Sequence, residues 1–93
     1  MIDFLVHEAD DSVGVVVVEG VTAGQTLHGW IMQGDGEVTM TARDAIPIGH
    51  KIAIRDLGVD ASVIKYGVDI GRVIAPIATG QHLHVHNVKT RRW

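Results

Sequence analysis

The sequence predicts an all-β fold of short strands joined by tight turns. Gly is the main punctuation, with 11 copies in 93 residues, and the apolar stretches between the glycines are short and β-branched. No segment repeats its apolar residues at helical spacing over three turns, so at most short helical turns are expected. A chain of 10.0 kDa can build one modest core, which predicts a single domain over residues 1–93.

The first half of the chain is expected to form strands around two turns. Aspartates mark the first turn, and the second has the glycine-rich composition of a hairpin. In order, the predicted elements are a strand at Asp3–Val6, a turn at Asp10-Asp11, a strand at Ser12–Val18, a strand at Leu27–Met32, the hairpin turn Gln33-Gly34-Asp35-Gly36 and a strand at Glu37–Thr41.

The segment after these strands predicts one short helical turn and a further hairpin. Thr41-Ala42-Arg43-Asp44 has a capping residue followed by an acid three positions on. Pro47 would end that turn, because the residue before proline is pushed toward extended geometry. Lys65-Tyr66-Gly67, followed by Ile70-Gly71-Arg72, predicts the hairpin.

One pattern recurs three times: an apolar residue, a Gly three positions later, and an apolar residue three positions after that. The copies are Val21-Thr-Ala-Gly24-Gln-Thr-Leu27, Ile46-Pro-Ile-Gly49-His-Lys-Ile52 and Ile77-Ala-Thr-Gly80-Gln-His-Leu83. Each copy predicts a turn that leads into a strand, with Gly supplying the backbone freedom at the bend. Their spacing is too irregular for a solenoid, so we expect three similar turns in one compact domain.

Charge is distributed unevenly along the chain. Residues 1–42 hold seven acidic residues and no Lys or Arg, whereas residues 43–93 hold four acidic residues and all eight basic residues. One interpretation is a locally positive surface that faces an anionic small molecule. The other is that the two halves interleave in the fold and their charges mix.

The composition also excludes several classes of protein. Few basic residues and only four aromatic residues argue against nucleic-acid binding. The longest apolar run, Val15–Val18, is far too short for a membrane span. The chain has no cysteine and an acidic N-terminal segment, which argues against a disulfide framework and a signal peptide. We therefore expect a soluble cytoplasmic protein.

Three alternating histidines, His82, His84 and His86, are the most informative residues. On a strand they would share one face, and Leu83 and Val85 would anchor the opposite face. Imidazole is a ligand for Fe, Zn and Ni, so the row predicts a metal site. Same-face neighbours on a strand lie about 7 Å apart, so a bend or a ligand from another chain is needed to complete the site. The alternative is a polar face exposed to solvent.

The segment Gly49-His50-Lys51 is the second candidate site. It follows a turn that contains proline, and His and Lys side chains donate hydrogen bonds or protons to anionic substrates. His50 and Lys51 are therefore the candidate catalytic residues, and the alternative is a loop with two solvated side chains. His7 and His28 are isolated in the sequence and are expected to be structural.

Four motifs follow one another in the second half of the chain. They are Ile46-Pro-x-Gly-His-Lys-Ile-Ala53, Val63-Ile-Lys-Tyr-Gly67, Ile70-Gly71 and Gly80-x-His82-x-His84-x-His86-Asn87. Together they resemble the SAF domain of the altronate/galactarate dehydratase family. The resemblance covers about Ala45 to the C-terminus, and the ordered set is specific whereas each motif alone is weak. It implies a β-clip, a small all-β fold of short bent strands.

The resemblance also implies a site and a partner. In that family the small domain is fused to, or is a separate subunit beside, a large catalytic part of an iron-dependent lyase that acts on anionic 2-hydroxy acids. Its motifs would assign catalytic roles to His50 and Lys51. A divalent metal, expected to be Fe(II), would be bound by His82, His84 and His86. Substrate would be bound by Lys65, Tyr66 and Asn87.

Two activities within the family fit the chain. The opening Phe4-Leu-Val-His7-Glu8 and the ending Asn87–Trp93 resemble a separate small subunit that helps split (2R)-3-sulfolactate into pyruvate and sulfite. The alternative is the small subunit or N-terminal domain of a sugar-acid dehydratase of the altronate/galactarate type. An alternative of another class is a non-catalytic binding or assembly module, because a fold alone proves no activity. The incomplete set of catalytic groups predicts that the isolated chain is inactive.

Overall fold

The structure is a computed structural model that describes residues 1–90. Over these residues the chain forms strands and no helix, which confirms the all-β prediction. The strands are β1 (Phe4–Val6), β2 (Val13–Val16), β3 (Thr26–Ile31), β4 (Gly36–Thr41), β5 (Lys51–Ala53), β6 (Ser62–Lys65), β7 (Val68–Val73), β8 (His82–Leu83) and β9 (Val88–Thr90). Within the described part of the chain, no helix could span a membrane.

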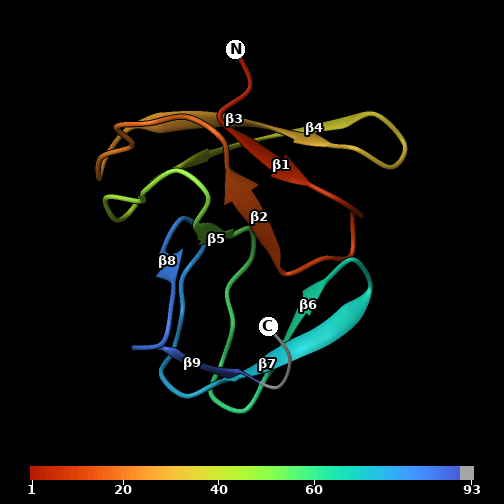
Figure 1. Cartoon of the computed structure of the whole chain (residues 1–93), viewed down its shortest axis with the longest axis vertical. Helices are drawn as coiled ribbons and strands as arrows, with labels where there is room; N and C mark the ends of the chain where they lie inside the picture. The colour runs from red at the N-terminus through yellow and green to blue at the C-terminus, as the bar shows by residue number, and fades with distance from the viewer. Residues whose placement is uncertain (91–93) are drawn as a thin grey trace.

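The strands form two sheets. The larger sheet has six strands in the order β4-β3-β1-β2-β5-β8, and the smaller has three in the order β6-β7-β9. Strands β1 and β3 pair in parallel, and the other paired strands are antiparallel. Figure 1 shows β3 and β4 at one end of the long axis and the smaller sheet at the other. Strands β5 and β8 lie between these two ends.

Two hydrophobic cores lie on opposite faces of the larger sheet. The first core consists of Phe4, Val6, Val16, Val21, Leu27, Ala42, Ile46 and Ile52. The second core consists of Val13, Ala53, Leu57, Val63, Val73, Ile77, Leu83 and Val88. Successive side chains of a strand point to opposite faces, so β2 and β5 contribute to both cores. The smaller sheet covers only the part of the second face that holds the second core.

The three predicted strand-leading turns are confirmed, and the structure adds a fourth. Gly24, Gly49 and Gly80 have φ values of 90°, 84° and 92°. The fourth turn spans Leu57 to Val63, and Asp60 stands where the others have Gly, with φ of 72°. The search for glycine missed this copy. Asp is among the few other residues that tolerate the left-handed region, which explains the substitution.

The four turns are also joined in pairs, one pair in each core. The apolar residue that opens each turn is buried, and the openers form two isolated bridges, Val21 with Ile46 and Leu57 with Ile77. The turns therefore pair with one another in addition to leading into strands.

Both predicted hairpins are confirmed. Strands β3 and β4 join through a turn in which Gly34 and Asp35 have positive φ. Strands β6 and β7 join through Tyr66 and Gly67, whose φ values are 56° and 70°. Two consecutive residues with positive φ are typical of the turn type that matches strand twist.

The helical turn predicted for Thr41-Ala42-Arg43-Asp44 is wrong. Thr41 ends β4, and the chain then bends without forming a helical turn. The Ala42 N–H donates to the Gln25 carbonyl at 2.8 Å, and the Arg43 N–H donates to the Gly80 carbonyl at 2.9 Å. Pairing with distant segments therefore replaces the local hydrogen bonds that a helical turn needs.

A buried carboxylate fixes the β6–β7 turn against the start of β2. Asp11 is fully buried, and its side chain accepts hydrogen bonds from the backbone N–H groups of Tyr66 at 3.0 Å and Gly67 at 3.1 Å. Its carboxylate also accepts from the Glu8 N–H at 3.3 Å. Because several backbone donors satisfy the charge, Asp11 positions Tyr66 without being exposed to solvent.

Candidate functional site

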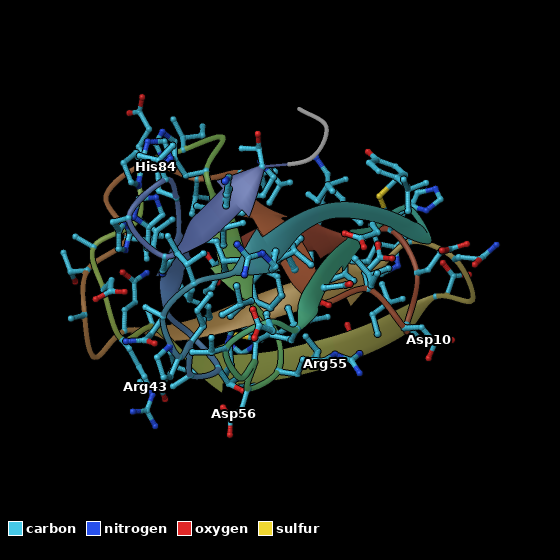
Figure 2. The ribbon with its side chains drawn as sticks, turned by 90° about the horizontal axis from the view of Figure 1, so that it is seen from below. Asp10, Arg43, Arg55, Asp56 and His84 are labelled. Atoms are coloured by element: carbon cyan, nitrogen blue, oxygen red, sulfur yellow. The ribbon has the colours of Figure 1, made fainter. Side chains whose placement is uncertain are left out.

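The pairing of β5 with β8 brings histidines from two distant segments together. Ile52 lies opposite His82, and Lys51 lies opposite Leu83. Side chains that face one another across paired strands share a face, and alternation places His50 on the same face as Ile52. His50 therefore meets His82, although 32 residues separate them. In Figure 2, His84 lies on the opposite side of the molecule from Asp10.

The three rings form a compact cluster. His50 Nδ1 and His82 Nε2 are 2.9 Å apart, so the pair shares one proton in a hydrogen bond. The ring centroids of His84 lie 5.3 Å from those of His50 and 5.6 Å from those of His82. One ring nitrogen from each of the three residues falls within 4.8 Å of the others. We call His50, His82 and His84 the histidine cluster.

The histidine cluster fits a metal ion. Nitrogens bound at about 2.1 Å to one tetrahedral ion lie roughly 3.4 Å apart, so the rings must rotate to close the cluster around an ion. His84 is exposed and can make that rotation, whereas His50 and His82 are half-buried. Neutral imidazole is the form that binds metal, and an ion would replace the hydrogen bond between His50 and His82.

His82 is further tuned by its surroundings. Its pKa is lowered from the ordinary value of 6.5, first by partial burial and then by the neighbouring histidines. Asp44 acts in the opposite direction on that pKa, and its carboxylate accepts a hydrogen bond from the His82 N–H at 2.9 Å. The lowered pKa favours the neutral, metal-binding form of the ring.

His50 occupies a special position in its strand-leading turn. In the turns that open at Val21 and at Ile77 the residue after Gly is Gln, and its side chain accepts a hydrogen bond from the backbone at the start of the same turn. The distances are 3.2 Å for Gln25 and 2.6 Å for Gln81. In the second turn His50 replaces this Gln, and its ring bonds to His82 instead. The substitution converts a structural position into one that carries an imidazole ligand.

The prediction that His82, His84 and His86 share one strand face is wrong. Strand β8 covers only His82 and Leu83, and the chain turns from His84 onward. Leu83 is buried as expected, but Val85 is 63% exposed and anchors nothing. The bend leaves His86 outside the cluster, with its ring 5.8 Å from that of His82. The group that can hold an ion therefore consists of His50, His82 and His84, and His86 is not part of it.

Asn87 holds this bend in place. It is buried, its side-chain oxygen accepts from the His84 N–H at 3.0 Å, and its side-chain amide donates to the His82 carbonyl at 2.9 Å. Asn87 was predicted to bind substrate. In the structure, its side-chain oxygen and nitrogen both bond to the loop that carries His82 and His84.

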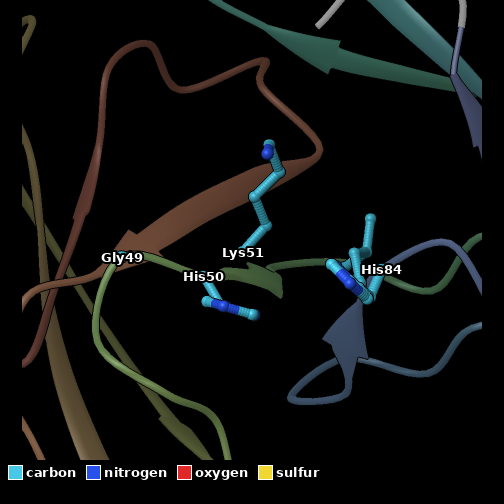
Figure 3. Close-up of a pocket in the computed structure, with 5 residues that line it drawn as sticks. Gly49, His50, Lys51 and His84 are labelled. Atoms are coloured by element: carbon cyan, nitrogen blue, oxygen red, sulfur yellow. The ribbon is translucent and has the colours of Figure 1, made fainter.

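A small pocket of about 160 Å³ opens beside the cluster, lined by Gly49, His50, Lys51, Leu83 and His84. Figure 3 shows His50 and Lys51 leaving the chain in opposite directions, so the two predicted catalytic residues do not point at one spot. Burial, and then the charge of Lys65, lower the pKa of Lys51 below its ordinary value. Lys51 therefore lines the pocket and also lies near enough to Lys65 for the two charges to interact.

Lys65 and Tyr66 line a different hollow of about 340 Å³. We call it the second-face groove: His7, Lys65 and Tyr66 line it together with aliphatic side chains of β1, β2 and the loops after β2 and β3. The His7 and Tyr66 rings are 4.2 Å apart, and Lys65 Nζ lies 5.3 Å from the centre of the Tyr66 ring. From the sequence, His7 was predicted to be an isolated structural residue, because 59 positions separate it from Tyr66 along the chain.

Comparisons with known proteins agree with this architecture. The model of the altronate/galactarate dehydratase SAF domain matches residues 2–91. The alpha subunit of (2R)-sulfolactate sulfo-lyase from Chromohalobacter salexigens is 66% identical over 92 residues, which are 99% of this chain and 98% of that protein. The corresponding subunit from Paracoccus pantotrophus is 41% identical over 63 residues, which are 68% of this chain and 94% of that protein.

A larger relative has a different organisation. The altronate dehydratase of Bacillus subtilis is 33% identical over 85 residues, which are 91% of this chain but only 16% of that protein. The matched segment there is thus a small part of a much longer chain. The family model and these relatives, together with the all-β architecture, show that this chain belongs to the altronate/galactarate dehydratase SAF domain family.

Proposed function

We propose that this chain is the small subunit of a two-subunit lyase that splits (2R)-3-sulfolactate into pyruvate and sulfite. The observation that carries the proposal is the 66% identity to a sulfolactate sulfo-lyase alpha subunit across nearly the whole of both chains. The histidine cluster supports it, because the cluster offers a metal site open to a partner. We further propose that the subunit is one SAF domain, acts in the cytoplasm and binds neither nucleic acid nor membrane.

The reaction defines what the site must do. A base removes the proton at C2, the C3–S bond breaks with its electron pair on sulfite, and a double bond forms between C2 and C3. The resulting enol of pyruvate then takes a proton at C3 and becomes the keto acid. The protein must therefore bind the carboxylate, accept a proton and stabilise the negative charge on the departing sulfite.

This chain supplies part of that machinery. His50, His82 and His84 would hold the ion, which we propose to be Fe(II) because the family resemblance implies an iron-dependent enzyme. When bound, a divalent ion supplies Lewis-acid polarisation of substrate oxygens. Lys51 also lines the pocket, but its side chain leaves the strand opposite to His50, so the cation that it offers an anionic group of the substrate lies away from the histidine cluster. The large subunit supplies the remaining groups, so the isolated chain is inactive.

A sugar-acid dehydratase is the second candidate function. The similarity to the altronate dehydratase of Bacillus subtilis over 91% of this chain favours it. In a dehydration the leaving group at C3 is hydroxide, which needs protonation, whereas sulfite leaves as a stable anion. The assay of the assembled complex with sulfolactate, altronate and galactarate separates the two functions by product. Sulfite release supports the lyase, and turnover of a sugar acid alone would replace it with the dehydratase.

The first prediction concerns the ligands. His50→Ala and His84→Ala should each reduce Fe(II) bound to the purified complex at least tenfold, measured by elemental analysis, because each removes one of three ligands. His86→Ala should retain most of the metal, since His86 lies outside the cluster. His28→Ala on β3 is the matched control, because His28 is exposed and outside the cluster. Loss of metal in His86→Ala but not in His50→Ala would instead support the row His82, His84 and His86.

A further inference from the structure

The second-face groove lies on the face of the larger sheet that the smaller sheet leaves partly open. Leu5 pairs with Val15, and Val15 pairs with Lys51, so these three side chains form a row on one face. On the same face, Val13 and Ala53 are buried in the second core beneath the smaller sheet. The row beyond them has no such cover in the described part of the chain. The groove is therefore the uncovered continuation of a core face.

Apolar side chains line this uncovered part. Val17 is 38% exposed and Met32 is 43% exposed, and both line the groove together with Leu5 and Val15. Trp30, which pairs with Leu5 on the neighbouring strand, is 36% exposed. Contiguous exposed apolar side chains on a small domain mark a binding surface, because exposing them to water is unfavourable.

One side of the groove is polar and positively charged. Lys65 lines it, and Lys51 lies close enough for the charge of Lys65 to act on it. None of the lining side chains is acidic. Among residues 1–90, His7 Nδ1 is the buried side-chain nitrogen that has no hydrogen-bond partner. The groove thus offers an aliphatic floor and a cation, with the His7 ring at its edge.

We propose that the second-face groove is the docking site for a segment of the large subunit that carries an aliphatic side chain beside a carboxylate. The aliphatic side chain would cover Val15, Val17 and Met32, and the carboxylate would face Lys65. In the altronate dehydratase of Bacillus subtilis the matched segment is 16% of a single chain, so a domain of this kind is attached to a much larger remainder. This inference rests on the proposed two-subunit organisation.

The groove and the His50 and His82 rings lie on opposite faces of the larger sheet. Lys51 lines the histidine pocket, and Val15, its cross-strand neighbour, lines the groove. A large subunit seated on the groove would have to extend past the edge strand β8 to reach exposed His84.

The test measures complex formation with purified large subunit by isothermal titration calorimetry. Val17→Asp and Met32→Asp should each raise the dissociation constant of the complex at least tenfold, because each places a carboxylate on the apolar floor. Lys65→Glu should raise the dissociation constant by a similar factor, because it removes the cation. The matched controls are Val59→Asp and Lys89→Glu, which change exposed residues outside the groove and should leave binding within twofold.

Further measurements keep the outcome decisive. Binding unchanged in Val17→Asp, Met32→Asp and Lys65→Glu, or absent even for the unaltered chain, would overturn the docking proposal. Sedimentation of the isolated chain tests a second copy as occupant, and a dimer abolished by Val17→Asp with unchanged hetero-complex would also overturn it. Fe(II) content and thermal unfolding of each variant show that the cluster and the fold are intact. If docking behaves as expected but sulfolactate is not split, the proposed substrate fails and the docking site stands.

Discussion

Asn87 is the residue on which the shape of the metal site most depends. Its side chain accepts a hydrogen bond from His84 and donates one to His82, and it is buried. Asn87→Ala leaves the partly buried His84 N–H and His82 carbonyl without these partners, which should lower the free energy of unfolding by about 1–3 kcal/mol. Urea unfolding of the isolated chain measures this loss. A role in substrate binding alone would leave the unfolding free energy unchanged and raise only the KM of the complex.

Single residues also show the limit of the sequence. The row His82, His84 and His86 correctly identified the segment that carries two members of the cluster. It could not identify His50 as the third, because that contact depends on the pairing of β5 with β8 across 32 residues. Strand alternation is a local rule, and the bend fixed by Asn87 overrides it at His84.

At the scale of elements, the strand-leading turns show what a local pattern can predict. Three copies could be identified from Gly and its apolar neighbours, and all three have positive φ at Gly. The fourth copy was hidden because Asp60 provides the same backbone conformation. The Thr41–Asp44 segment failed for the opposite reason, since its local helical signal lost to hydrogen bonds with Gln25 and Gly80.

Two of these turns provide a matched pair of mutations. Gly24 and Gly80 have almost the same φ, but a Cβ at Gly24 would meet nothing within 4 Å, whereas a Cβ at Gly80 would collide with the Thr41 carbonyl oxygen. Gly24→Ala should cost about 1–2 kcal/mol of left-handed backbone strain. Gly80→Ala should cost roughly 1–3 kcal/mol more, because overpacking adds to the strain. Chemical denaturation of both variants gives the difference, and equal costs would contradict the predicted collision.

At the scale of the whole molecule, the larger sheet has one hydrophobic core on each of its two faces. Composition predicted the short strands, because β-branched segments and glycine are counted directly. The prediction of one modest core was wrong, since the buried side chains divide into two cores. Composition could not predict that Val13 and Val16, close together on β2, belong to different cores. That division depends on the smaller sheet covering part of one face, and the same division leaves the second-face groove open.

Because the molecule is small, metal binding should have a large effect on its stability. An ion at 100 times its dissociation constant adds about 2.7 kcal/mol to the folded state, and 1 kcal/mol moves the Tm of a 60–100-residue domain by about 4–8 °C. Fe(II), added without oxygen to the isolated chain at pH 7.5, should therefore raise Tm by roughly 10 °C or more. The same addition to His50→Ala should shift Tm far less.

The pH dependence of that shift follows from His82. Its pKa is lower in the folded chain than the ordinary value of 6.5, so the unfolded chain binds this proton more tightly. Stability should therefore be retained above about pH 6.5 and decline as pH falls through the lowered folded value. Protonation of the cluster also competes with the ion, so the Fe(II)-dependent rise in Tm should shrink over the same range. Thermal unfolding between pH 8 and pH 5, with and without Fe(II), measures both effects, and a rise that persists undiminished at pH 5 would mean that the ion is held by groups other than these imidazoles.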